Sequence, residues 1–313
     1  MGWSILFKIV IAIVICALLV KCIGKKKTPD GLDGWLDLYF PDQFKVIYTL
    51  TENPIKQLSF SVKNSVLASK SDSLLQIKIR WDKRVVGLGI NKVEIDNSLI
   101  KAKAELADTR ILLDQLKSSG LQKFSCGIYL GDVRILIFEE PTSNKRAETL
   151  KQLLSVLSKW SAASKYGLVV DFMEAKSFGT EVGDIIPLVH WQQGSPWQRQ
   201  NSILSIQNEP GYNFNPDTFE KKWQFNTESD RLLKWIDQSR PVALKWAKSH
   251  MKKSIELLSE VEYTIQENGM DVQIKFGFTH IKVSKEQSTV DGYIVGIYVF
   301  DGDQFENLKF AQE

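Results

Sequence analysis

Histidine and cysteine are scarce in this 313-residue chain, which holds three of each. Two of the cysteines lie in or beside an N-terminal apolar stretch, so Cys126 is the only thiol in the remainder and no disulfide can form within it. None of the three histidines (His190, His250 and His280) lies within four residues of another histidine or a cysteine. The ligand spacing of a zinc site is therefore missing, and we expect neither a metal nor another cofactor. We expect Cys126 and His190 in the core and His250 on a helix surface.

Excess positive charge is also missing from most of the chain. The formal net charge is +3 in total, but residues 1–27 alone hold five lysines and no acidic residue, which leaves a net charge of −2 for residues 28–313. A protein that binds nucleic acid through its phosphates needs a surplus of cations. We therefore expect no nucleic-acid partner.

The longest apolar run lies at the N-terminus. Residues 9–20 contain no polar side chain except the thiol of Cys16. Counted from Trp3 to Ile23, the apolar stretch reaches about 20 residues, which is the length of a helix that crosses a membrane. The sequence therefore predicts a transmembrane anchor with a basic flank in residues 1–27.

Basic residues follow the apolar stretch and favour its retention in the membrane. We expect them to contact anionic lipid headgroups. These residues are Lys21, Lys25, Lys26 and Lys27. They also crowd the place where a secretory signal would be cleaved, and the positive-inside rule puts the rest of the chain on the cytoplasmic face. A cleaved signal, a lipoprotein signal and an interfacial helix are the alternatives.

Beyond the anchor, runs of strands and then helices predict an α+β fold with mostly antiparallel sheet and three to four helices. We expect an α+β domain over residues 28–191, a long connection over 192–226, and a helix pair with antiparallel strands over 227–313. The alternative is one continuous domain that joins the first and last of these parts.

Periodicity places the individual elements. Strands are predicted at residues 44–50, 58–62, 74–81, 85–90, 124–130, 133–138, 168–173, 185–189, 202–206, 270–283 and 293–300. Helices are predicted at residues 98–117, 144–161, 228–239 and 241–268, the last of them opened by Pro241.

One group of polar residues stands at the end of an apolar strand. Asp171 lies within it, and Glu174 and Lys176 are two residues apart, so on a strand their side chains would point the same way. Such a pair can hold a divalent metal and position a water, as in nucleases of the PD-(D/E)xK class. An acid two residues before a lysine should also occur about three times by chance in this composition. A companion aspartate is not identifiable, and Asp132 is a distant candidate.

A second group lies in the segment that follows residue 190. Trp191, Trp197 and Arg199 occur among amide side chains in an apparent loop. Tryptophan and arginine on loops are typical anchors of binding surfaces, although packing under the long connection would explain them equally well.

The function that these patterns favour is a membrane-tethered, non-catalytic module that binds another protein. An anchored metal-dependent hydrolase or nuclease that uses Glu174 and Lys176 is the first alternative. A structural protein that faces the outside of the cell is the second.

Overall fold

The computed structural model describes residues 31–51, 62–174, 183–193, 201–210, 219, 221–280 and 290–311. The predicted anchor lies outside the described residues, as do the four lysines that flank it and Lys176, Trp197 and Arg199. Within the described ranges, no helix has both the length and the apolar character that a membrane crossing needs. The chain divides into two compact units, up to Lys103 and from Ala104. The domain boundaries expected from the sequence stay a prediction.

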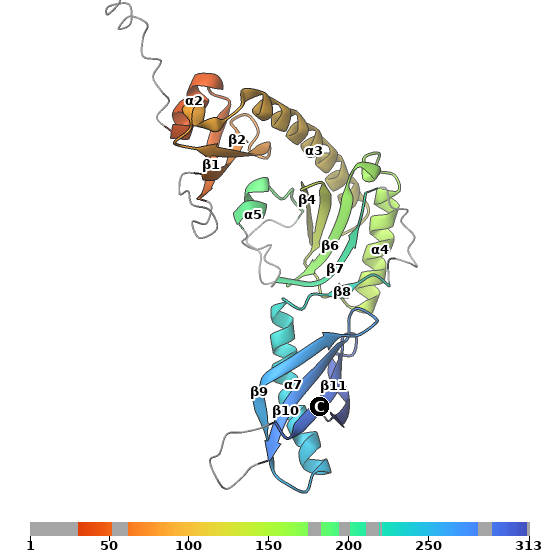
Figure 1. Ribbon diagram of the computed structural model, residues 1–313. Coiled ribbons are helices and arrows are strands. Elements are labelled where there is room, and N and C mark those ends of the chain that lie inside the picture. The colour runs from red at the N-terminus through yellow and green to blue at the C-terminus, as the bar shows by residue number, and fades with distance from the viewer. Residues whose placement is uncertain are drawn as a thin grey trace, which may run out of the picture. The chain divides into compact units, whose positions relative to one another are not determined.

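The first unit combines a short helix with a three-stranded antiparallel sheet (Figure 1). Its elements are α2 (Gly31–Tyr39), β1 (Phe44–Thr51), β2 (Val62–Ser69), β3 (Gln76–Asp82), the 3-10 helix η1 (Val86–Gly89) and the start of α3 (Lys92–Ser118). Trp35 and Leu36 of α2 pack with Leu67 and Ile79 of the sheet in a buried cluster. Neither α2 nor the early start of α3 is predicted by the sequence.

The prediction of a strand at residues 85–90 is wrong. Gly87, Leu88 and Gly89 have φ angles of 66°, 61° and 64°, which curl the segment into η1. Glycine adopts positive φ readily, so the glycine pair marks a turn of the backbone here.

The second unit begins with a five-stranded sheet of order β4-β5-β6-β7-β8. Its elements are the end of α3, β4 (Phe124–Tyr129), β5 (Asp132–Ile137), α4 (Ser143–Leu157), the 3-10 helix η2 (Ala163–Lys165), β6 (Gly167–Met173), α5 (Leu188–Gln193), β7 (Ser202–Asn208) and β8 (Gln224–Phe225). The β5–β6 pair is parallel, because α4 crosses between them, and the other pairs are antiparallel.

One face of this sheet is packed by α3 and α4, as Figure 1 shows for α4. Leu116 of α3 and Leu153 of α4 lie in the same buried cluster as Ile135 of β5 and Val170 of β6. Thr142 caps α4, because its hydroxyl accepts a hydrogen bond from the backbone N–H of Lys145. Side chains at alternate positions of the strands therefore point to the second face of the sheet.

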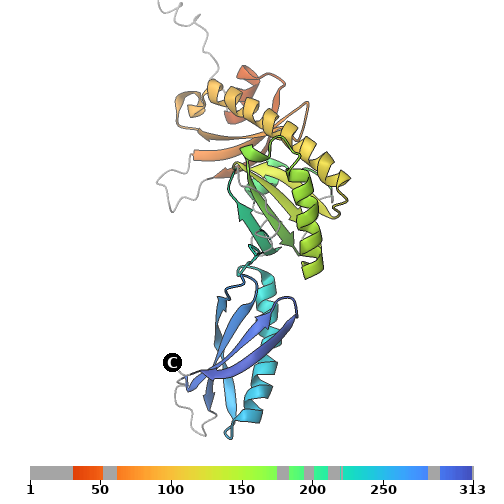
Figure 2. The same ribbon diagram turned by 90° about the vertical axis from the view of Figure 1, so that its right-hand side faces the viewer.

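The chain ends in a helix and a four-stranded antiparallel meander. These are α7 (Asp230–His250), β9 (Ile255–Ile265), β10 (Val272–His280), β11 (Gly292–Val299) and β12 (Gln304–Ala311), in the order β12-β11-β10-β9. Figure 2 shows α7 lying along one face of this sheet. Trp235 and Ala243 of α7 share the buried cluster with Ile274 and Phe276 of β10.

Of the two helices predicted in this region, the first is helical from Asp230 on, but the break at Pro241 and the extension of the second helix to residue 268 are wrong. A single helix, α7, runs through Pro241 and ends at His250, and residues 255–265 form strand β9 instead of continuing a helix. The apolar spacing of three and four runs on to Val261, but the helix itself ends at His250. Beyond it, pairing with β10 decides the structure, with Val261 opposite Phe276 and Tyr263 opposite Ile274.

Two smaller differences also follow from long-range contacts. Only Ile185 of the predicted strand 185–189 pairs, in a parallel bridge to Cys126, and α5 begins at Leu188. Strand β12 is not predicted by the sequence. The α+β class with mostly antiparallel sheet is confirmed, with five α-helices among the described residues.

Candidate functional site

The second face of the five-stranded sheet carries polar side chains around a pocket of about 440 Å³. Arg134 of β5, Asp171 of β6, Ser205 and Gln207 of β7, and Trp191 of α5 all line it. In the strand register, Val169 pairs with both Arg134 and Gln207, and Asp171 pairs with Ser205. We call this cavity the Arg134 pocket.

Two aromatic rings hold Arg134 in place. Tyr129 and Trp191 stack with ring centroids 5.4 Å apart and planes inclined by 16°. The Arg134 guanidinium carbon lies 5.5 Å from the Trp191 centroid and 5.9 Å from the Tyr129 centroid, in range for cation–π attraction. Gln192 fixes Tyr129 through a 2.9 Å hydrogen bond from Nε2 to the phenol oxygen.

The guanidinium of Arg134 has N–H donors that make no hydrogen bond with the described residues. Its Nε is buried and has no hydrogen-bond partner within the described part of the chain. Arginine presents five N–H donors in a planar fork that matches a carboxylate or a phosphate. Because Nε is enclosed and the residue as a whole is half-buried, a ligand in the pocket would be bound by the other N–H donors of the fork, which make no hydrogen bond with the described residues.

Asp171 and Glu228 are the other charged groups that line the pocket, and Asp171 lies partly buried. Removal of water from around its carboxyl raises the pKa to about 6, while Arg134 and a hydrogen bond from Ser202 act in the opposite direction. The Ser202 hydroxyl donates to Oδ1 of Asp171 at 3.1 Å, and the amide of Asn226 donates to the Ser202 carbonyl at 3.0 Å. This carboxyl therefore changes its charge close to neutral pH.

The structure brings together two residues that the sequence analysis treats separately. Asp171, from the acidic group, and Trp191, from the aromatic group, line the same pocket. Arg134 is absent from the prediction. The only signal for it is its place between Val133 and Ile135 in an alternating strand, which normally marks a solvated face.

Glu174 lies elsewhere and is engaged by cations of α7. Its Oε1 accepts a hydrogen bond from Arg231 Nε at 3.1 Å and lies 3.7 Å from Lys234 Nζ. Asp132 pairs with Gly167, which is four residues and so about 13 Å along the strand from Asp171. In the ranges that the structure describes, no group of three or more histidine, cysteine, aspartate or glutamate residues is placed to hold a metal ion.

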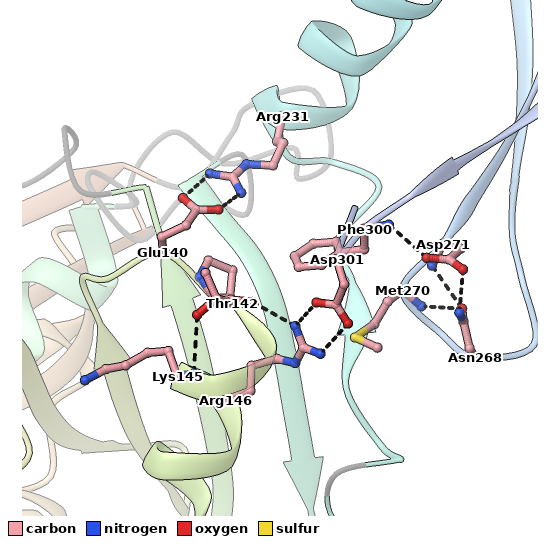
Figure 3. A network of polar contacts seen from close by, with 11 residues as sticks. Glu140, Thr142, Lys145, Arg146, Arg231, Asn268, Met270, Asp271, Phe300 and Asp301 are labelled. Atoms are coloured by element: carbon pink, nitrogen blue, oxygen red, sulfur yellow. Dashed lines mark hydrogen bonds and ion pairs between the residues drawn. The ribbon is translucent and has the colours of Figure 1, made fainter. Parts of the chain in front are cut away.

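A second pocket of about 440 Å³ lies where α4, α7 and the β11–β12 turn meet (Figure 3). We call it the junction pocket. Arg231 binds both carboxylate oxygens of Glu140, and Arg146 binds both of Asp301, at 2.7 and 3.0 Å. Arg146 is only 2% exposed and also donates to the Pro141 carbonyl at 2.8 Å. Both arginines of this region thus form bidentate ion pairs with carboxylates of the fold.

The remaining candidates from the sequence occupy structural positions. Cys126 is buried, and burial raises its pKa to about 12, so the thiolate that nucleophilic chemistry needs is not accessible. His250 is exposed at the end of α7 and stacks on Trp246 with centroids 4.4 Å apart. His280 bonds to Asp291 through Nδ1 at 3.1 Å. His190 is half-buried on α5, so its predicted place in the core at the end of a strand is wrong.

Comparisons of this chain with protein-family models, with curated proteins and with solved structures found no match.

Proposed function

We propose that this chain is a non-catalytic binding module that recognises a carboxylate of a partner protein in the Arg134 pocket. The observation that carries the proposal is the guanidinium of Arg134, which makes no hydrogen bond and no ion pair with any described residue, although Tyr129 and Trp191 both contact it. An arginine that is already positioned loses little conformational entropy when it binds.

The other groups of the pocket suit recognition of a protein segment. Ser205, Gln207 and Gln224 add hydroxyl and amide groups that can donate to and accept from a peptide backbone. The volume of about 440 Å³ admits one or two side chains, and it lies within the range of about 300–1,000 Å³ that is usual for ligand pockets. We therefore propose that an acidic side chain or a chain end enters the pocket.

Peptide display against the full chain in detergent micelles tests this proposal. We expect selected peptides to carry Asp, Glu or a free C-terminal carboxylate, and to lose binding to Arg134→Ala. Arg84→Ala is the matched control, because Arg84 is an exposed arginine that bonds to Asp82 in the first unit. Peptides without a carboxylate, or binding that survives Arg134→Ala, would contradict the proposal.

A second candidate function, an enzyme that uses Asp171 as an acid or a base, is favoured by the pKa of about 6. The two candidates respond differently to Asp171→Asn. An enzyme would lose turnover, whereas a module that binds carboxylates would keep or gain affinity, because the variant removes a negative charge from beside Arg134.

The proposed location of this module is the cytoplasmic face of a membrane, with residues 1–27 as the tether. The support is the apolar stretch and the lysines at positions 21, 25, 26 and 27. A reporter fused after Glu313, together with extraction of membranes at alkaline pH, tests both points. We expect the reporter to be cytoplasmic and the chain to stay with the membranes. Release of the chain by alkaline extraction would contradict the tether.

A further inference from the structure

Helix α3 has two apolar faces on opposite sides. Its inward face includes Leu106, Leu112 and Leu116, which are buried. At 100° per residue, Val93, Ile100 and Ile111 fall on the side opposite to these residues. Their exposed fractions are 62%, 67% and 48%. A helix of a single globular domain normally has one apolar stripe, so the outward stripe needs its own explanation.

The outward stripe follows a heptad repeat. Its six positions are separated by steps of four, three, four, three and four residues, and every one of them is exposed. They are Val93, Asn97, Ile100, Ala104, Ala107 and Ile111. We call this set the α3 seam. In heptad notation Asn97, Ala104 and Ile111 take position a, and the other three take position d.

Charges beside the α3 seam are complementary between two identical helices. In a parallel coiled coil, a residue at position g faces the residue five positions later on the other helix. Asp96 thus faces Lys101, and Lys103 faces Asp108. Both pairs are opposite in sign and occur twice in a symmetric dimer. Asp108 also accepts hydrogen bonds from Lys165 and Tyr166 of its own chain.

We propose that α3 pairs with α3 of a second copy of this chain as a parallel, in-register, two-stranded coiled coil. Parallel pairing places Asn97 opposite Asn97, where the two amides can bond to each other and fix the register. In an antiparallel pair aligned on the seam, Asn97 would face Ala107, and Lys101 would face Lys101 of the other copy. The charges and the asparagine therefore both favour the parallel arrangement.

The α3 seam spans fewer than three heptads, and two of its positions are alanine. Coiled coils that are recognised by sequence alone usually sustain three to four heptads. We therefore expect a weak dimer, which forms when the chains are concentrated in the plane of a membrane or in micelles.

Disulfide cross-linking of the full chain tests the proposal. Cys16 and Cys22 are replaced by serine, and Cys126 is buried and stays. In a parallel dimer Val93→Cys links to Val93→Cys, whereas in an antiparallel dimer it meets Ile111→Cys, which lies about 27 Å away along the helix. We mix the two variants, one of them carrying a mass tag. Leu130→Cys, 82% exposed and off the α3 seam, is the control for random collision.

We expect Val93–Val93 links at least fivefold above the Leu130→Cys background, and no excess of mixed links. Asp96→Lys should weaken linking through like charges, and Asp96→Lys combined with Lys101→Asp should restore it. Mixed Val93–Ile111 links, linking at the background level, or a double variant no better than the single one would overturn the proposal.

Discussion

The junction pocket and the Arg134 pocket each have a volume of about 440 Å³ and each contain an arginine near acidic side chains, but the arginines have different partners. In the junction pocket, Arg231 is bound by Glu140 and Glu174, and the nearby Arg146 by Asp301. In the Arg134 pocket, aromatic rings contact the arginine, and no hydrogen bond or ion pair joins its guanidinium to a carboxylate of the described residues. The first arrangement stabilises the fold, and the second leaves a donor for a ligand.

Because of this difference, we expect mutations of the junction arginines to change stability and mutations of Arg134 to change ligand binding. Removal of an arginine from the junction should lower the free energy of unfolding, because its partners are left buried or unpaired. Removal of Arg134 should affect ligand affinity and leave the fold almost unchanged.

The largest effect is expected for Arg146→Ala. The variant leaves Asp301 without its partner, the Pro141 carbonyl without its donor, and a cavity beside Phe300. We expect the free energy of unfolding to fall by about 3 kcal/mol, mainly because a cavity forms and a buried carbonyl loses its donor, since the Asp301 side chain is itself 44% exposed. Urea unfolding followed by circular dichroism measures this.

Arg134→Ala is the matched comparison for Arg146→Ala. It removes mainly cation–π contacts, and we expect a loss of less than about 1 kcal/mol. Equal losses for the two variants would show that the two pockets do not differ as described.

A smaller, pH-dependent effect is expected for Asp171. The folded carboxyl holds its proton up to about pH 6, whereas the ordinary value is 3.8, so the folded state binds more protons in this window. The free energy of unfolding of the natural chain should therefore fall as the pH rises from 4 to 6 and stay low above it. We expect Asp171→Asn to be more stable than the natural chain by about 2 kcal/mol at pH 7.5 and to lose this advantage by pH 4. Urea unfolding at a series of pH values checks this, and parallel curves for the two proteins would contradict it.

The smallest effect is expected for Trp191→Ala. The ring positions the Arg134 guanidinium but does not bond to a carboxylate itself, so we expect about a fivefold loss of affinity for an acidic peptide. Trp191→Phe should lose less, because it keeps an aromatic face. Titration calorimetry with a displayed peptide measures both variants. A larger loss for Trp191→Phe than for Trp191→Ala would contradict this role.

Local sequence patterns predict the elements whose contacts are also local. The hairpin of β4 and β5 follows from the turn at Gly131, and α4 follows from its apolar stripe and the cap at Thr142. By contrast, residues 255–261 continue a helical spacing but form a strand, because β10 pairs with them from further along the chain. Pairing with a strand further along the chain cannot be predicted from a short stretch of sequence.

The candidate site is only partly predictable for the same reason. The sequence singles out Asp171 and Trp191 as candidates, but the alternating pattern around Arg134 predicts only an ordinary solvated residue of a strand. Its environment depends on α5, which reaches β4 because Gly127 leaves room. A Cβ at Gly127 would lie 3.1 Å from the Ile186 carbonyl oxygen and 3.6 Å from Nε1 of Trp191. No pattern among neighbouring residues in the sequence predicts that contact.

The claim that Arg134 binds a carboxylate is tested most directly by a double-mutant cycle between the chain and its peptide. Four affinities are measured by calorimetry, for an acidic peptide and its Glu→Gln analogue with the natural chain and with Arg134→Gln. We predict that the peptide change weakens binding to the natural chain by about tenfold, a coupling of about 1.4 kcal/mol, and leaves binding to Arg134→Gln unchanged. The same loss with both proteins would contradict the account.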